Sequence, residues 1–154
     1  MISRDQSSKA MEADSQFMSE AIEAAKRGGN PFGCVIVMDG KMVVKAFNTV
    51  KKENDPTAHA EINAIRSLGK LKLPSHSPLT LYTTCEPCPM CMSAIVFAGI
   101  GKVVFGASIA EISRCYKQID IPAEEVALRG FGSVEVKGGV MAEQCLDLLK
   151  NKKS

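Results

Sequence analysis

The chain has no apolar run long enough to cross a membrane, and its first residues lack the apolar core of a secretory signal peptide. Tryptophan is absent, aromatic residues make up only 5% of the chain, and we find no internal repeat or low-complexity segment. The net charge is close to balance at +2, so charge argues neither for nor against a nucleic-acid partner. These absences exclude a membrane-spanning helical protein and a repeat array.

What the chain contains is typical of a soluble globular protein. It has 154 residues, of which 45% are apolar, and this length allows one domain with a sizeable core. Residues 1–11 are polar and unpatterned, so we expect a flexible tail there and a single domain over residues 12–154. Six cysteines without an export signal indicate reduced thiols or metal ligands rather than disulfides. We therefore expect a cytoplasmic protein.

Hydrophobic periodicity and turn signals predict alternating helices and strands. The Asp39-Gly40 pair is a strong hairpin signal between the first two strands. Strands separated by helices predict parallel pairing, and hence an α/β fold: a three-layer α/β/α sandwich with a five-strand mixed sheet, antiparallel at its first hairpin. The predicted strands are 34–38, 41–47, 79–83, 102–105 and 133–137, with helices up to Gly28 and at about 59–68, 88–98 and 141–151, a polar connection at 48–58, and an ambiguous segment at 107–130.

Two short stretches contain the residues of chemical interest. One is His59-Ala60-Glu61, and the other is Pro87-Cys88-Pro89-Met90-Cys91. Residues two apart on a regular helix point to nearly opposite sides, so the first stretch can present both side chains to one site only at the start of a helix. Proline suits the first position inside a helix, which places the second stretch at a helix start as well. Such ends carry partial positive charge, which favours thiolates over thiols.

These residue types suit a catalytic zinc site. Zinc prefers four tetrahedral nitrogen and sulfur ligands, and His59, Cys88 and Cys91 would leave its fourth position to water. The metal would lower the pKa of that water towards about 7 and so provide hydroxide at neutral pH. Glu61 would then carry the proton between the water and the substrate. We therefore predict Zn²⁺ as the cofactor and Glu61 as the catalytic residue.

A closed structural zinc site is the alternative reading of the same residues. Cys85 could join His59, Cys88 and Cys91 in a Cys₃His site with no open position. Glu61 would then be an ordinary surface carboxylate, and the protein would be a non-enzymatic zinc module.

Together the two stretches resemble the zinc-dependent cytidine deaminase superfamily. The resemblance extends over most of residues 16–106, and it includes the segments 30–37 and 54–61 and the strand before the cysteines. The segment 54–61 is similar to a stretch shared by guanine deaminases and tRNA adenosine deaminases. The resemblance thus implies a cytidine deaminase-like fold, bound zinc and a deaminase activity.

The implied reaction is hydrolytic deamination of a nucleobase. Zinc-bound hydroxide attacks the ring carbon that bears the amine, Glu61 serves as the proton shuttle, and ammonia leaves. The resemblance also assigns substrate contacts, with Asn48 on the polar edge of the ring and Phe32 packed against it. The backbone N–H of Ala60 and the carbonyl of Cys85 are candidates for contacts around the attacked carbon. On the residues alone, Asn48 could equally end a strand in a turn, and Phe32 could equally be a core residue.

The second half of the chain separates the branches of the superfamily. Residues 116–125 resemble the corresponding part of bacterial guanine deaminases, whereas residues 107–111 do not match the Lys-Gly-Ala-Gly-Ser-like stretch of the tRNA-editing branch. We therefore expect a free purine base or nucleoside as substrate, with guanine as the leading candidate. A tRNA adenosine deaminase is the first alternative and a cytosine-type base deaminase the second. The expected partners are a small nucleobase or nucleoside, water and a second copy in a homodimer, with no membrane and with nucleic acid not favoured.

Overall fold

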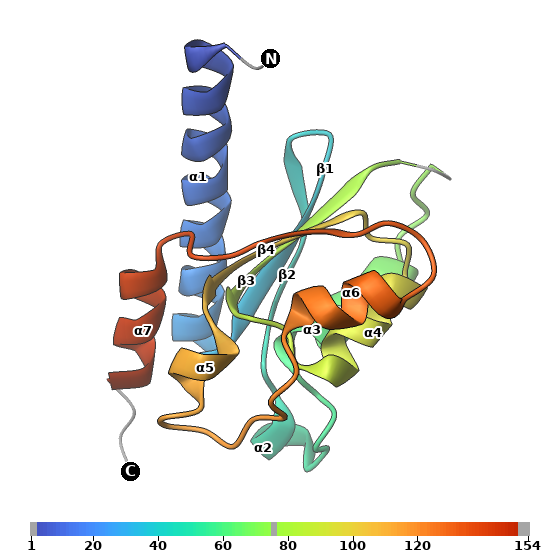
Figure 1. Ribbon diagram of the computed structural model, residues 1–154. Coiled ribbons are helices and arrows are strands. Elements are labelled where there is room, and N and C mark those ends of the chain that lie inside the picture. Colours follow the sequence, from blue (N-terminus) through green and yellow to red (C-terminus); the bar gives the residue numbers. More distant parts are fainter. Residues whose placement is uncertain (1–2, 75–76, 151–154) are drawn as a thin grey trace.

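The computed structural model describes residues 3–74 and 77–150 and contains a five-stranded mixed sheet with helices on both faces (Figure 1). The strand order is β2-β1-β3-β4-β5. β1 pairs antiparallel with both β2 and β3, whereas β3 pairs parallel with β4 and β4 with β5. The predicted three-layer α/β/α architecture is thus confirmed. The strands are β1 Gly33–Met38, β2 Lys41–Phe47, β3 Leu79–Cys85, β4 Lys102–Ala107 and β5 Glu135–Lys137.

The two faces of the sheet carry different helices, as Figure 1 shows. α1 and α7 cover one face, where Met18 and Cys145 pack against strand residues such as Val35 and Val104. α3, α4 and α6 cover the other face, where Met92 and Ile95 contribute to the larger apolar core. The helices are α1 Arg4–Gly28, α2 Val50–Glu53, α3 Ala60–Gly69, α4 Pro89–Phe97, α5 Ile109–Ile112, α6 Ala123–Arg129 and α7 Ala142–Lys150.

The hairpin and helix signals of the sequence are confirmed. Asp39 and Gly40 both have positive φ angles, of 50° and 75°, as a tight two-residue hairpin turn requires. α1 ends with Gly29 in the left-handed conformation, where its N–H caps the carbonyls of Ala25 and Lys26. The ambiguous segment contains α5 and α6, joined by an irregular stretch that includes Pro122. Local turn chemistry thus determines the hairpin turn and the end of α1.

Two regions expected as loops contain helix that the sequence did not predict. Residues 4–11, expected as a flexible tail, form the first turns of α1, because Ser3 and Gln6 make a capping box that starts the helix. Their side chains are exposed, so this part of the helix has no apolar stripe that could have predicted it. The polar connection 48–58 contains the single helical turn α2, which ends at Asn54 in the left-handed conformation. Within residues 3–74 and 77–150, no helix is both long and apolar enough to cross a membrane.

Candidate metal centre and active site

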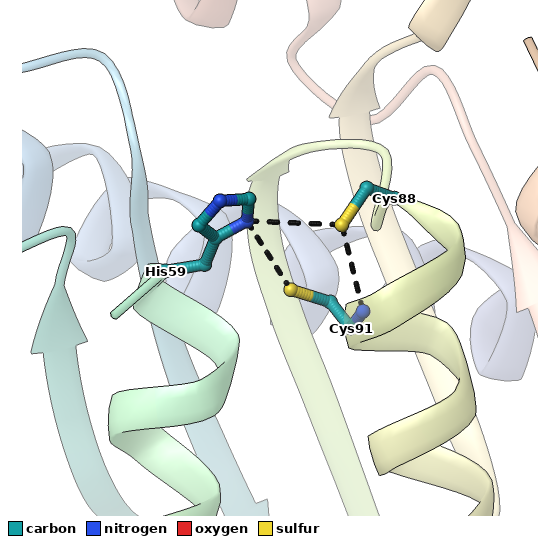
Figure 2. Close-up of side chains that lie close together, drawn as sticks. All are labelled: His59, Cys88 and Cys91. Atoms are coloured by element: carbon teal, nitrogen blue, oxygen red, sulfur yellow. Dashed lines mark hydrogen bonds between the residues drawn. The ribbon is translucent and has the colours of Figure 1, made fainter. Parts of the chain in front are cut away.

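The two predicted motifs occupy the starts of two helices on the same face of the sheet. His59 is the N-cap residue of α3, and Cys88 is the N-cap residue of α4. Both have extended backbones, with ψ angles of 158° and 166°, so each side chain leaves the helix at its end rather than along its flank. Pro89 occupies the first position of α4, as predicted. Figure 2 shows the imidazole and the two thiols pointing toward one another from these two helices.

The distances within this group fit a tetrahedral zinc ion. His59 Nδ1 lies 3.5 Å from Cys91 Sγ and 3.7 Å from Cys88 Sγ. The three ligand atoms all lie within 4.8 Å of one another. Bond lengths of about 2.0–2.1 Å for Zn–N and about 2.3 Å for Zn–S imply N···S separations of about 3.6 Å around a tetrahedral ion. His59, Cys88 and Cys91 are thus positioned to bind a metal, and they supply three of its four positions.

The protonation of the two thiols is linked. The pKa of Cys88 is lowered to about 4, chiefly because the Cys91 thiol donates to its sulfur, with further help from His59. The Cys91 backbone N–H, at 3.5 Å, also donates to this sulfur at the start of α4. The pKa of Cys91 is raised, first by its bond to Cys88 and then by burial. Cys88 is therefore the more readily ionised of the two thiols, and a bound cation would replace the proton of the other.

The structure does not support the closed Cys₃His alternative. Among the described residues, the group that could hold a metal contains His59, Cys88 and Cys91 but not Cys85. Cys85 instead packs in the core cluster under α1 and α7, where burial is the main cause of its raised pKa. A tetrahedral zinc held by His59, Cys88 and Cys91 would keep its fourth position for water, as a catalytic site requires.

Glu61 is a buried carboxylate beside the ligand group. It lies in the first turn of α3, and only 6% of its surface is exposed. Its Oε1 accepts a hydrogen bond of 2.5 Å from the Thr83 hydroxyl on β3. Its charge contributes to the raised pKa of both Cys91 and His59, after the larger effect of Cys88 on each. The acid is therefore close to the ligands without being one of them.

Two of the predicted substrate-binding residues, Asn48 and Phe32, contact each other through their backbones. Asn48 follows β2, and its backbone N–H donates to the Phe32 carbonyl at 3.1 Å. Its side-chain Oδ1 accepts from Val50 N at 3.0 Å, which is the turn role that the sequence left open. This turn does not use the amide Nδ2. Phe32 is partly buried against both core clusters and makes an edge-to-face contact with Tyr116, with ring centroids 5.1 Å apart.

The two predicted backbone contacts come from the ends of elements. Ala60 is the first residue of α3, and the first N–H groups of a helix have no partner within the helix. Cys85 is the last residue of β3, next to the loop that leads to Cys88. The structure thus brings Ala60 and Cys85 to the same edge of the sheet as the ligand group, at the carboxyl end of β3.

Three residues that support the site were not predicted from the sequence. Thr83 binds Glu61, Tyr116 packs on Phe32, and the buried Glu86 connects the cysteine loop to α5 and α6. Thr83 could have been noticed, because a polar residue inside an otherwise apolar central strand needs a hydrogen-bonding partner. Tyr116 lies in the segment whose structure the sequence left ambiguous, so its contact could not have been inferred.

A comparison with protein families identifies the chain. Residues 11–107 match the family described as the cytidine and deoxycytidylate deaminase zinc-binding region. The chain belongs to this family. It is a deaminase, and the matched region contains His59, Cys88 and Cys91, the group already positioned for a metal.

Two kinds of deaminase stand out among the similar proteins. The guanine deaminase of Bacillus subtilis (strain 168) is 42% identical over 125 residues, which cover 71% of this chain and 78% of the relative. The tRNA-specific adenosine deaminase of the same organism is 36% identical over 147 residues, with coverage of 90% and 88%. A solved structure from a study of A-to-I editing by tRNA:A34 deaminases has a TM-score of 0.68 and 31% identity, and the match covers 86% of this chain and 98% of that one. The fold is thus shared with a solved deaminase.

Proposed function

We propose that this deaminase hydrolyses the exocyclic amine of a purine base or nucleoside, with guanine as the leading substrate. The observation that carries the proposal is a group of three metal-ligating side chains with a buried carboxylate beside it that is not a ligand. His59, Cys88 and Cys91 would hold the zinc. When bound there, zinc would act as a Lewis acid that lowers the pKa of a water in its fourth position.

Glu61 is assigned the proton transfers of the reaction. Its carboxylate takes a proton from the attacking water and delivers it to the ring nitrogen next to the attacked carbon. A second proton passes through the same carboxylate to the exocyclic nitrogen, and the C–N bond then breaks. One water is consumed, the ring gains a carbonyl oxygen, and ammonia leaves. Burial of Glu61 suits this role, because it keeps bulk water away from the carboxylate.

Four further residues are assigned to substrate binding. The Asn48 side-chain amide would bond the polar edge of the ring, and Phe32 would pack against its face. The Ala60 N–H and the Cys85 carbonyl would bond groups around the attacked carbon. All four belong to segments that meet at the carboxyl end of β3, which supports this assignment.

The substrate preference rests on the relatives. The 42% identity with a guanine deaminase supports guanine. A tRNA adenosine deaminase is the second candidate, because such relatives match over 90% of the chain and include a solved structure. The candidates differ in electrostatics: an enzyme that binds RNA phosphates loses affinity steeply with salt, whereas an enzyme for a neutral base does not.

Ammonia release across a panel of substrates tests the proposal. The panel contains guanine, guanosine, adenine, cytosine and a tRNA anticodon stem-loop, each at low and high salt. We expect the highest kcat/KM on guanine, with little salt dependence. Highest activity on the stem-loop, weakened by salt, would replace guanine with the second candidate. Zinc-loaded protein that releases ammonia from none of the five would overturn the enzymatic proposal.

A further inference from the structure

Thr83 is a polar side chain buried at the centre of the sheet. It lies on β3, between Cys34 of β1 and Phe105 of β4, and only 1% of its surface is exposed. A hydroxyl in such a place is costly unless it is hydrogen-bonded. Its Oγ1 donates to Glu61 Oε1. The central strand β3 therefore also contacts Glu61, the carboxylate beside the metal ligands.

The hydrogen bond from Thr83 to Glu61 comes from a strand of the sheet, β3. The metal ligands His59 and Cys88 instead lie at the N-termini of helices α3 and α4. Glu61 thus bonds the Thr83 hydroxyl, and its charge is also near enough to the Cys91 thiol to help raise the pKa of that thiol, after the larger effects of Cys88 and burial. A hydroxyl both donates and accepts, so Thr83 can stay bonded to Glu61 whether the acid is ionised or carries a proton. A carboxylate held in this way keeps one oxygen fixed during both proton transfers.

We propose that Thr83 is the positioning residue for Glu61: its hydroxyl holds Oε1 so that the carboxylate stays aimed at the reacting atoms through the catalytic cycle. This inference rests on the proposed proton-carrier role of Glu61. Thr83 touches neither substrate nor metal in this scheme, and it acts only through the acid. It therefore differs from a substrate-binding residue, whose loss would mainly raise KM.

The kinetic test compares Thr83→Val with Thr83→Ser in zinc-loaded protein. Valine keeps the shape and removes the hydroxyl, so we expect kcat to fall by about 10- to 100-fold while KM stays within about twofold. Serine keeps the hydroxyl, so we expect it to restore kcat to within about threefold of the parent. Zinc content, measured on each variant, should equal that of the parent. A kcat for Thr83→Val within twofold of the parent, or a serine variant as slow as the valine one, overturns the inference.

A second readout does not depend on activity. Unfolding equilibria are measured for the parent, Thr83→Val, Glu61→Ala and the double variant. Together they form a double-mutant cycle, which gives the energetic coupling of the two side chains. We expect the two substitutions to be coupled by about tenfold in the unfolding equilibrium constant. Thr84→Val is the matched control, because Thr84 is equally buried but points to the other face of β3, where it bonds the Pro31 carbonyl. The coupling factor between Thr84→Val and Glu61→Ala should be close to one, which means that the two substitutions act independently.

The two readouts separate this inference from the proposed function. A coupling factor near one between Thr83→Val and Glu61→Ala would mean that the two side chains act independently. This result overturns the inference whatever the activity of the enzyme. A parent that releases no ammonia from any base overturns the proposed function, and with it the catalytic meaning of the contact. An active parent with coupled side chains but an unchanged kcat in Thr83→Val overturns the positioning role alone.

Discussion

At the scale of the residue, the position of Glu61 next to three ligands leads to the first prediction. Glu61→Gln should retain the fold and the zinc but lose about 10²- to 10⁴-fold in kcat, because an amide does not carry the proton. Thermal unfolding, metal content and ammonia release measure the three properties separately. A glutamine variant almost as fast as the parent would show that another group moves the proton.

The ligand cysteines lead to a second prediction. Cys88→Ser should lower zinc retention at least about tenfold, because a serine hydroxyl is a far weaker ligand than the Cys88 thiolate. Metal content after dialysis against a mild chelator is the measurement. Cys115→Ser is the matched control, because Cys115 is exposed and lies outside the ligand group. Equal zinc in the two variants would contradict the assigned ligand set.

Much of the site was predictable at this scale. His59, Glu61, Cys88 and Cys91 could be found because their chemistry and spacing appear within two short stretches of sequence. Thr83 could not be paired with Glu61, because the two residues meet only when the fold brings the start of α3 to the end of β3. The sequence also left open whether Asn48 ends a turn or binds substrate, and the structure shows the turn contact. The substrate role of Asn48 stays a prediction.

At the scale of the element, Glu86 connects three segments. Its carboxylate is buried and accepts 2.8 Å hydrogen bonds from Ile109 N and Ala123 N, the first residues of α5 and α6. Glu86→Ala would leave both N–H groups without their partner, so we expect a loss of about 2–4 kcal/mol in the free energy of unfolding. Urea denaturation measures it. Glu124→Ala, in an exposed position of α6, should cost less than about 1 kcal/mol.

Several elements up to α4 were predictable because each has its own local signal. The hairpin turn, the glycine that ends α1 and the proline that starts α4 are all visible in the sequence. The segment 107–130 has weak signals, because α5 and α6 are short and their N-termini bind Glu86 from a distant part of the chain. Tertiary contacts, rather than propensity, determine the place of these helices.

At the scale of the whole molecule, the buried Asp14 links distant parts of the chain. Asp14 of α1 accepts bonds of 2.8 Å from the Tyr82 hydroxyl of β3 and from Lys137 Nζ of β5. Burial, and then the bond to Asp14, raise the pKa of Tyr82 above its ordinary value of 10.0. Because the folded state holds the phenol proton more tightly, this contribution to stability is complete below about pH 10 and is lost as the pH rises through the folded pKa.

A fourth prediction follows from the raised pKa of Tyr82. The free energy of unfolding should fall more steeply above about pH 10 for the parent than for Tyr82→Phe, which has no phenol to ionise. Denaturant midpoints between about pH 8 and about pH 11 measure the difference, and lysine titration is common to both proteins. Parallel pH profiles for the two proteins would contradict it.

The architecture of the whole molecule was predictable from the order of its elements. Strands alternating with helices predicted the mixed sheet, and the structure confirms it, although β1 also runs antiparallel to β3. The homodimer and the cytoplasmic location stay predictions. Sedimentation of the zinc-loaded protein is the direct measurement of its assembly state.

The placement of the metal ligands has one more consequence. His59 begins α3 and Cys91 lies in α4, so an ion held between them would cross-link a loop of the chain that contains the whole of β3, the strand at the centre of the sheet. Such a metal cross-link would stabilise the folded state relative to the unfolded state. Loss of the ion would then weaken the scaffold and the chemistry together, so metal supply in the cell would govern how long the enzyme survives as well as how fast it turns over.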